Sequence, residues 1–186
     1  MKIILASNSP RRKELLKKVN LNFDVVVSNI EEDENYNLTP QEYAKHLSFL
    51  KANSVYKKTK GLVIGADTIV CIDNEILGKP KNLEDAKKTL KKLSNKTHSV
   101  ITGFTIICED KIICDYEETK VVFNNLSDIL IDDYVKTGLP LDKAGSYGIQ
   151  DGYNLVKEIV GDYDNVVGLP TNKILKYISE LIWNLK

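Results

Sequence analysis

Three consecutive basic residues, Arg11, Arg12 and Lys13, stand where a helix is expected to begin. Pro10 suits the first helical position, and Ser9 before it suits the N-cap. A helix N-terminus carries positive partial charge, so each solvated cation there costs a few tenths of a kcal/mol. A solvated charged face would tolerate that cost, whereas a bound anion would turn the repulsion into an attraction.

The alternative to a solvated charged face is a site that binds phosphate. A strand expected over residues 2–6 runs into this helix, and a helix N-terminus directs free backbone N–H groups at a bound anion. The hydroxyls of Ser7 and Ser9 add donors, and the guanidinium forks of Arg11 and Arg12 match phosphate oxygens. The pattern alone leaves both interpretations open and does not identify the anion.

Asp67 lies inside a continuous apolar run, 62–72, which predicts a central strand buried on both faces. A carboxylate there is costly unless it is paired, bound to a metal, at a strand end facing a cleft, or capping a turn. Gly65 nearby permits close approach of another backbone segment. The acidic segment 31–34 is compatible with a solvated loop, but one of its carboxylates could meet Asp67 at a metal ion that bridges phosphate oxygens.

Three single polar residues are further candidates. Lys51 and Lys79 are each compatible with an ordinary surface position. Gln150 lies in a glycine-containing loop, where its neutral amide suits hydrogen bonds to a base edge or a phosphate. The usual phosphate loops, GxxxxGK[ST] and GxGxxG after a strand, do not occur.

Composition limits the class of protein. The 186 residues allow one domain with a core, or two closely joined lobes, and 42% of them are apolar. The 26 basic and 26 acidic residues cancel, which argues against a general nucleic-acid or membrane binder. No membrane span or signal peptide is recognisable, so a cytoplasmic location is expected. Cys71, Cys108 and Cys114 lie in apolar runs without a CxxC pair, as expected of buried reduced thiols.

The expected elements alternate along the chain and indicate a mixed sheet with helices packed on it, an α/β or α+β domain. His98 is expected at a strand edge. The predicted strands cover 2–6, 23–28, 62–72 and 155–160, with a long hairpin over 98–123 that turns at 109–111. The predicted helices cover 10–19, 40–56, 83–93 and 172–183, with a short one from Ser127 to Gly138. Residues 161–170 are expected to form an irregular loop.

Six motifs in order resemble the Maf family of nucleoside triphosphate pyrophosphatases. They are SNSPRRKELL, GADTIV, LGKP, THSVITG, DKAGSYGIQ and GDYDNVVGLP, and the resemblance runs from about Ile3 to Leu169. It implies an elongated two-lobed fold with a central cleft, similar to that of inosine triphosphate pyrophosphatase, as a single domain over 1–186. It also implies hydrolysis of a nucleoside triphosphate to the monophosphate and pyrophosphate, with Mg²⁺ or Mn²⁺.

The same resemblance implies roles for individual residues. The family's catalytic aspartate matches Asp67, which would act as general base or hold the metal, with Glu32 sharing the metal. The phosphate-binding motif matches Ser7, Ser9, Arg11 and Arg12, and further polar cleft positions match Glu32, Lys51 and Lys79. The branch that prefers dTTP and UTP over 7-methyl-GTP is marked by an arginine, a threonine and a glutamine, which are here Arg11, Thr68 and Gln150.

One position departs from the family's pattern. Asp151 follows Gln150, where the family usually has glycine, and it places a negative charge beside an expected polyanion site. The alternatives are a 7-methyl-GTP pyrophosphatase, an enzyme for modified pyrimidine triphosphates, and a nucleotide-binding regulator of septum formation without turnover. Asp67 favours an enzyme, because a carboxylate beside a polyanion weakens simple binding. The expected partner is the nucleotide, without nucleic acid or membrane, and the apolar hairpin could serve a homodimer.

Overall fold

The computed structural model describes residues 2–30 and 38–183. These residues form a mixed sheet in the order β2-β1-β3-β5-β6-β7, with β4 paired to β3 outside that path. β1 pairs in parallel with β2 and β3, and the remaining pairings are antiparallel. The strands are β1 (Ile3–Leu5), β2 (Asp24–Val25), β3 (Leu62–Ile72), β4 (Glu75–Leu77), β5 (Thr97–Cys108), β6 (Lys111–Phe123) and β7 (Val156–Val160).

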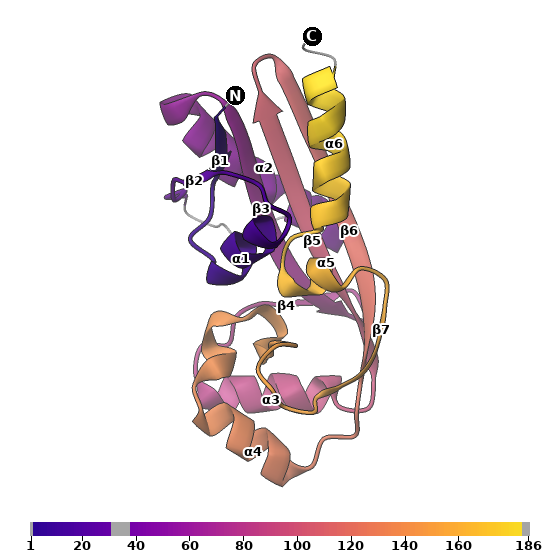
Figure 1. Cartoon of the computed structure of the whole chain (residues 1–186). Helices are drawn as coiled ribbons and strands as arrows, with labels where there is room; N and C mark the ends of the chain where they lie inside the picture. The colour runs from indigo at the N-terminus through magenta and orange to yellow at the C-terminus, as the bar shows by residue number, and fades with distance from the viewer. Residues whose placement is uncertain (1, 31–37, 184–186) are drawn as a thin grey trace.

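Helices cover both faces of the sheet and build a second lobe below it (Figure 1). The helices are α1 (Pro10–Lys18), α2 (Pro40–Thr59), α3 (Leu83–Leu93), α4 (Asp128–Lys136), α5 (Tyr163–Val167) and α6 (Thr171–Trp183), with short 3₁₀ turns η1 (Leu139–Asp142) and η2 (Ala144–Ser146). Among the described residues, no helix has the length and apolar character needed to cross a membrane.

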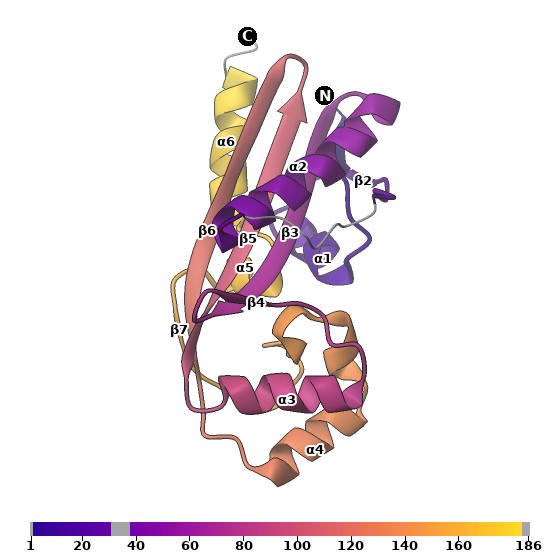
Figure 2. The same ribbon diagram turned by 180° about the vertical axis from the view of Figure 1, so that it is seen from behind.

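Two lobes share the long strands β3, β5 and β6, which run from one lobe into the other (Figure 1). In the upper lobe, α1, α5 and α6 lie on one face of the sheet and α2 crosses the other, as Figure 2 shows from behind. The lower lobe contains α3, α4 and the 3₁₀ turns. Its core includes Leu90, Phe123, Ile131 and Tyr134, whereas a separate upper cluster includes Phe104.

A gap in the pairing of β3 marks the boundary between the lobes. On one edge, β3 pairs with β1 over Leu62–Ile64 and with β4 over Val70–Ile72. Asp67 and Thr68 lie between these two pairings, and in the described chain only β5 pairs with them. The edge of the sheet is therefore open to side chains where β1 ends and α1 begins.

Two glycines allow α2 to lie directly against the sheet. A Cβ added at Gly65 would lie 2.5 Å from the carbonyl oxygen of Ser48, and one at Gly103 would lie 2.2 Å from the carbonyl carbon of Ala44. Real Cβ atoms do not approach backbone so closely. The close packing of α2 on β3 and β5 therefore depends on glycine at both positions, as the sequence indicated for Gly65.

The structure corrects several element predictions. β2 is limited to Asp24–Val25, β4 was not expected, and α5 forms inside the segment predicted to be irregular. His98 is not an edge residue: it is buried in β5, since the lower lobe packs over this end of the sheet. The cysteines are free, with Cys71 and Cys108 buried and Cys114 half-buried.

Candidate active site

A cleft of about 650 Å³ lies between the lobes at the gap in β3. Several site residues predicted from the sequence line it together, although they come from distant segments. They are Ser9, Arg11, Arg12, Lys51, Asp67, Thr68, Lys79 and Gln150. Ser7 is buried behind them and contacts Arg12, and Glu32 lies outside the described residues.

Asp67 and Lys51 form a close ion pair inside this cleft. Lys51 Nζ donates to Asp67 Oδ1 over 2.5 Å, and the two side chains are only 13% and 12% exposed. Lys51 comes from α2, and the glycine-dependent packing of that helix brings its ammonium group to β3. The sequence singled out both residues but did not predict that they pair.

Arg12 connects three parts of the upper lobe. Its Nε donates to the carbonyl oxygen of Gly168 over 2.8 Å, and its Nη2 donates to Thr68 Oγ1 over 3.0 Å. Its Nη1 donates to Ser7 Oγ over 3.2 Å. A guanidinium fork can make these three contacts at once because its donors are held in one plane.

The other two cations of the first turn also have protein partners. Arg11 Nη1 lies 3.1 Å from Asp142 Oδ2, a contact that joins α1 to η1 of the lower lobe. Lys13 Nζ donates to Asn8 Oδ1 over 2.9 Å. Local oxygen acceptors therefore offset the repulsion between these cations and the helix N-terminus, independently of any bound anion.

Thr68 is supported from the strand beside it. Its hydroxyl lies 3.0 Å from the hydroxyl of Thr102, the residue that pairs with it in register on β5. Thr102 in turn donates to the backbone carbonyl of Asn165 on α5 over 3.1 Å. Thr102 was not predicted as a site residue, although it lies in the motif THSVITG. Its pairing with Thr68 joins β3 to β5, two strands that are not neighbours along the chain.

Gln150 lies exposed on the cleft wall, in a turn held from below by residues that the site prediction missed. Tyr134 Oη accepts from the N–H of Gly148 over 3.0 Å and donates to Asp151 Oδ2 over 2.5 Å. Burial and then the hydrogen bond to Asp151 raise the pKa of Tyr134, so the phenol stays protonated. Lys143 Nζ lies 3.4 Å from Asp151 Oδ2.

Lys143 and Arg11 also contact Asp142 at the cleft. Lys143 Nζ lies 2.8 Å from Asp142 Oδ1, while Arg11 binds the other oxygen. Partial burial by itself would raise the pKa of Asp142, but the hydrogen bonds from Lys143 and Arg11 outweigh it and lower that pKa. Asp142 is therefore an ionised link between the two lobes at neutral pH.

The residues present fit a divalent cation that arrives with phosphate ligands. Mg²⁺ is usually held by one or two carboxylates, waters and substrate phosphates rather than by a complete protein cage. Asp67 supplies such a carboxylate, whose Oδ1 accepts a hydrogen bond from Lys51. Over residues 2–30 and 38–183, no group of three or more His, Cys, Asp or Glu side chains forms a preassembled metal site.

The fold and the cleft define a two-lobed α/β protein whose cleft holds the Asp67–Lys51 pair together with Arg11, Arg12 and Lys79. The chain belongs to the Maf family: the family model described as "Maf-like protein" matches residues 2–181. A dTTP/UTP pyrophosphatase of Thermosipho africanus is 50% identical over 99% of this chain and 93% of that protein. A dTTP/UTP pyrophosphatase of Clostridioides difficile is 49% identical over 94% of this chain and 92% of that protein.

The solved structures support the fold. A HAM1 protein from Coxiella burnetii superposes with a TM-score of 0.50 at 16% sequence identity, covering 81% of this chain and 89% of that chain. The predicted mixed α/β fold is confirmed.

Proposed function

We propose that this protein hydrolyses dTTP and UTP to the nucleoside monophosphate and pyrophosphate. The observation that carries the proposal is the pairing of Asp67 with Lys51 in a cleft that Arg11, Arg12 and Lys79 also line. A binding protein gains nothing from a buried carboxylate beside a polyanion, whereas hydrolysis needs a group that accepts a proton from water. The relatives named dTTP/UTP pyrophosphatase cover nearly the full chain, which supports the same assignment.

In the proposed reaction, water attacks the α-phosphorus and the bond from that phosphorus to the α–β bridging oxygen breaks. Asp67 orients this water or accepts its proton, and pyrophosphate leaves with the bond's electron pair. Lys51 holds Asp67 in place and, with Arg12 and Lys79, offsets the charge that accumulates on the phosphate oxygens. Arg12 is already ordered by Gly168 and Thr68, so little reorganisation is needed on binding.

A divalent cation, Mg²⁺ or Mn²⁺, would be held by Asp67 together with the substrate's phosphates, with Glu32 as the expected second carboxylate. When bound, it would polarise the phosphate oxygens and neutralise charge on the leaving pyrophosphate. Lys51, which donates to Asp67 Oδ1, would share this carboxylate with the cation.

Nucleobase recognition is assigned to Gln150, with Arg11 and Thr68 as the other branch-marking residues. A primary amide can accept from N3–H and donate to O4, the two groups that uracil and thymine share on one edge. Cytosine reverses this pattern. When the turn holds the amide in this orientation, Gln150 favours UTP and dTTP over CTP. Guanine presents N1–H and O6 in the same pattern as uracil, so the preference over 7-methyl-GTP is proposed from the names of the relatives instead.

The test is pyrophosphate release from a panel of dTTP, UTP, CTP, GTP and 7-methyl-GTP with Mg²⁺ or Mn²⁺, with a chelator control. Release from dTTP and UTP, lost with the chelator, would support the proposal. Preference for 7-methyl-GTP would overturn the substrate assignment. Nucleotide binding without release would instead favour a regulator of cell division.

Three further expectations stay predictions. The chain is treated as a single domain over 1–186, because the same long strands run through both lobes (Figure 1). A cytoplasmic location and a homodimer are likewise proposed from the sequence alone.

A further inference from the structure

The turn that carries Gln150 is tied to the lower lobe through buried polar groups. Tyr134 comes from α4 and has no exposed surface, and its hydroxyl is the shared partner of Gly148 N–H and the Asp151 carboxylate. Asp151 N–H also donates to the carbonyl oxygen of Gly148 over 3.2 Å, which closes the turn on itself. Gln150 lies within this closed turn.

The side chains of Asp151 and Lys143 pack against the turn so closely that they leave no room for a side chain at Gly148. A Cβ added at Gly148 would lie 2.7 Å from Asp151 Oδ2 and 2.7 Å from Lys143 Cε. The side chains of Lys143 and Asp151 are 8% and 13% exposed. Lys143 Nζ lies 3.4 Å from Asp151 Oδ2, and it also donates to Asp142 Oδ1 over 2.8 Å and to the carbonyl oxygen of Leu139 over 2.5 Å. The turn is thereby linked to η1 as well as to α4.

The negative charge of Asp151 has two local partners. Its Oδ2 atom accepts from the Tyr134 hydroxyl and faces the Lys143 ammonium group at 3.4 Å. Hydrogen bonds to charged groups stabilise more than those between neutral groups, and a buried one restricts its partners strongly. The aspartate that departs from the family's usual glycine thus stabilises the turn, and Lys143, which it shares with Asp142, offsets part of its charge at the cleft.

We propose that Tyr134, Asp151 and Lys143 form a positioning group that fixes the Gly148–Gln150 turn and so presents the Gln150 amide to the nucleobase. This inference rests on the proposed function. These residues are positioning residues, because none of them needs to touch the reacting phosphates. Their loss affects recognition of the base more than the chemical step.

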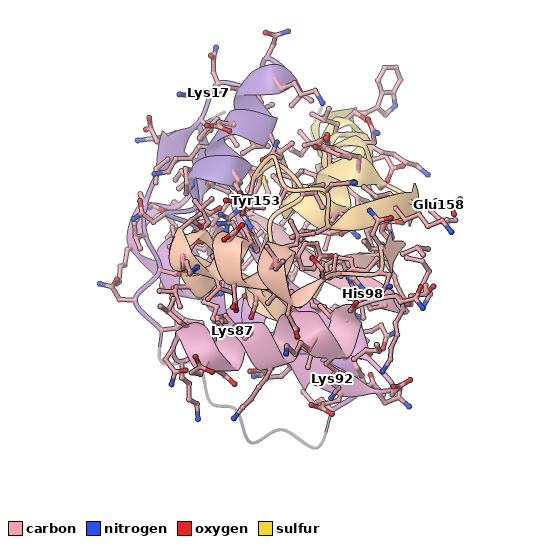
Figure 3. All side chains as sticks on the ribbon, turned by 90° about the horizontal axis from the view of Figure 1, so that it is seen from below. Lys17, Lys87, Lys92, His98, Tyr153 and Glu158 are labelled. Carbon is pink, nitrogen blue, oxygen red and sulfur yellow. The ribbon has the colours of Figure 1, made fainter. Side chains whose placement is uncertain are left out.

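The test compares Tyr134→Phe and Asp151→Asn with the wild type for UTP and CTP. Tyr134→Phe keeps the ring packed 4.7 Å from the ring of Tyr153, which Figure 3 labels in the lower lobe, and removes only the hydroxyl. We expect KM for UTP to rise about tenfold with kcat changed less than about twofold, and the preference for UTP over CTP to fall. Asp151→Asn keeps an acceptor for Tyr134 but loses the charge facing Lys143, so a smaller change in the same direction is expected.

Tyr153→Phe is the matched control. It also removes a hydroxyl from a ring of this pair, but within the described residues that hydroxyl makes no hydrogen bond. Unchanged KM and base preference in Tyr134→Phe and Asp151→Asn, with an active wild type, would overturn the inference. An equal fall in kcat for both nucleotides at constant KM would also overturn it, because that indicates damage to the chemical step. A wild type that hydrolyses none of the triphosphates would refute the proposed function, and the positioning role with it.

Amide hydrogen exchange of the turn gives a readout that does not depend on nucleotide. We expect Gly148 N–H to exchange at least about tenfold faster in Tyr134→Phe than in Tyr153→Phe. Equal protection in the two variants would show that the phenol does not hold the turn.

Discussion

Lys51 Nζ lies 2.5 Å from Asp67 Oδ1, and this contact joins α2 to the open edge of β3. Only about one eighth of either side chain is exposed, so the Asp67 carboxylate depends on the Lys51 ammonium group to compensate its charge. The pair sits at the point where the first-turn arginines and the phosphates of a bound nucleotide would meet. Its integrity is therefore expected to govern both stability and turnover.

Separate and combined replacements distinguish these two effects. Lys51→Ala leaves the Asp67 carboxylate buried without its partner, and the free energy of unfolding should fall by about 3 kcal/mol. The double variant Lys51→Ala/Asp67→Ala should recover much of this stability, yet remain inactive. Urea denaturation and pyrophosphate release measure the two quantities. A double variant that regains turnover would contradict the catalytic assignment.

The glycine-dependent contact of α2 predicts a large cost for a single methyl group. Gly103→Ala should lower the free energy of unfolding by about 2–3 kcal/mol, because the new Cβ would overlap the backbone of α2. Gly78→Ala is the matched control, since its Cβ would meet no atom within 4 Å. Similar denaturation midpoints for the two variants would show that α2 does not need this close approach.

Arg12 and Lys13 are adjacent cations, but replacing them is expected to change kcat/KM by different amounts. Arg12→Lys removes the fork that reaches Gly168, Thr68 and Ser7 together, so kcat/KM for UTP should fall by about 10- to 100-fold. Lys13→Ala removes a cation whose side chain contacts only Asn8 within the described residues, and kcat/KM should change less than about threefold. Equal losses in both variants would indicate that only the total charge matters.

His98 predicts a pH dependence of stability. Burial lowers the pKa of His98 from 6.5 to about 4, and its Nε2 lies 2.7 Å from the hydroxyl of Tyr147. The unfolded chain binds the proton near pH 6.5 and the folded chain only near pH 4. The stabilisation is therefore complete above pH 6.5 and is lost as the pH falls toward 4, by about 2 kcal/mol between pH 7.5 and 5.

Urea denaturation at these two pH values checks the prediction for His98, which Figure 3 labels in the lower lobe. His98→Gln should reduce the difference between pH 7.5 and 5, whatever its effect at pH 7.5. His46→Gln, a change on α2, should leave most of that difference in place. An undiminished difference in His98→Gln would show that another group is responsible.

The sequence predicted the parts of the fold that local pattern determines. The apolar run 62–72 matches β3, and Asn82 before 83–93 marks the start of α3, whose N-cap it is. α5 was missed because it has only five residues between glycine-containing turns, and β4 because three residues give no periodicity. The burial of His98 depends on the lower lobe, which local pattern does not place.

In the candidate site too, local sequence pattern indicated some residues, whereas their contacts depend on the packing of distant segments. Residue types at Asp67, Lys51 and Arg12 suggested phosphate chemistry, but Arg12 and Gly168 are 156 positions apart and meet only in the folded chain. Tyr134 shares the buried face of α4 with Ile131 and Val135, so in the sequence it resembles an ordinary core residue. Its contact with Asp151 arises from the packing of α4 under the turn, so no spacing in the sequence indicated it.

The most direct test of the central claim is hydrolysis of UTP in ¹⁸O-labelled water, with the products separated and weighed by mass spectrometry. Attack at the α-phosphorus predicts one ¹⁸O atom in UMP and none in pyrophosphate. Asp67→Asn should lower the rate by about 10²–10⁴-fold while UTP still binds. Label in pyrophosphate, release of orthophosphate with UDP, or an undiminished rate in Asp67→Asn would contradict the account.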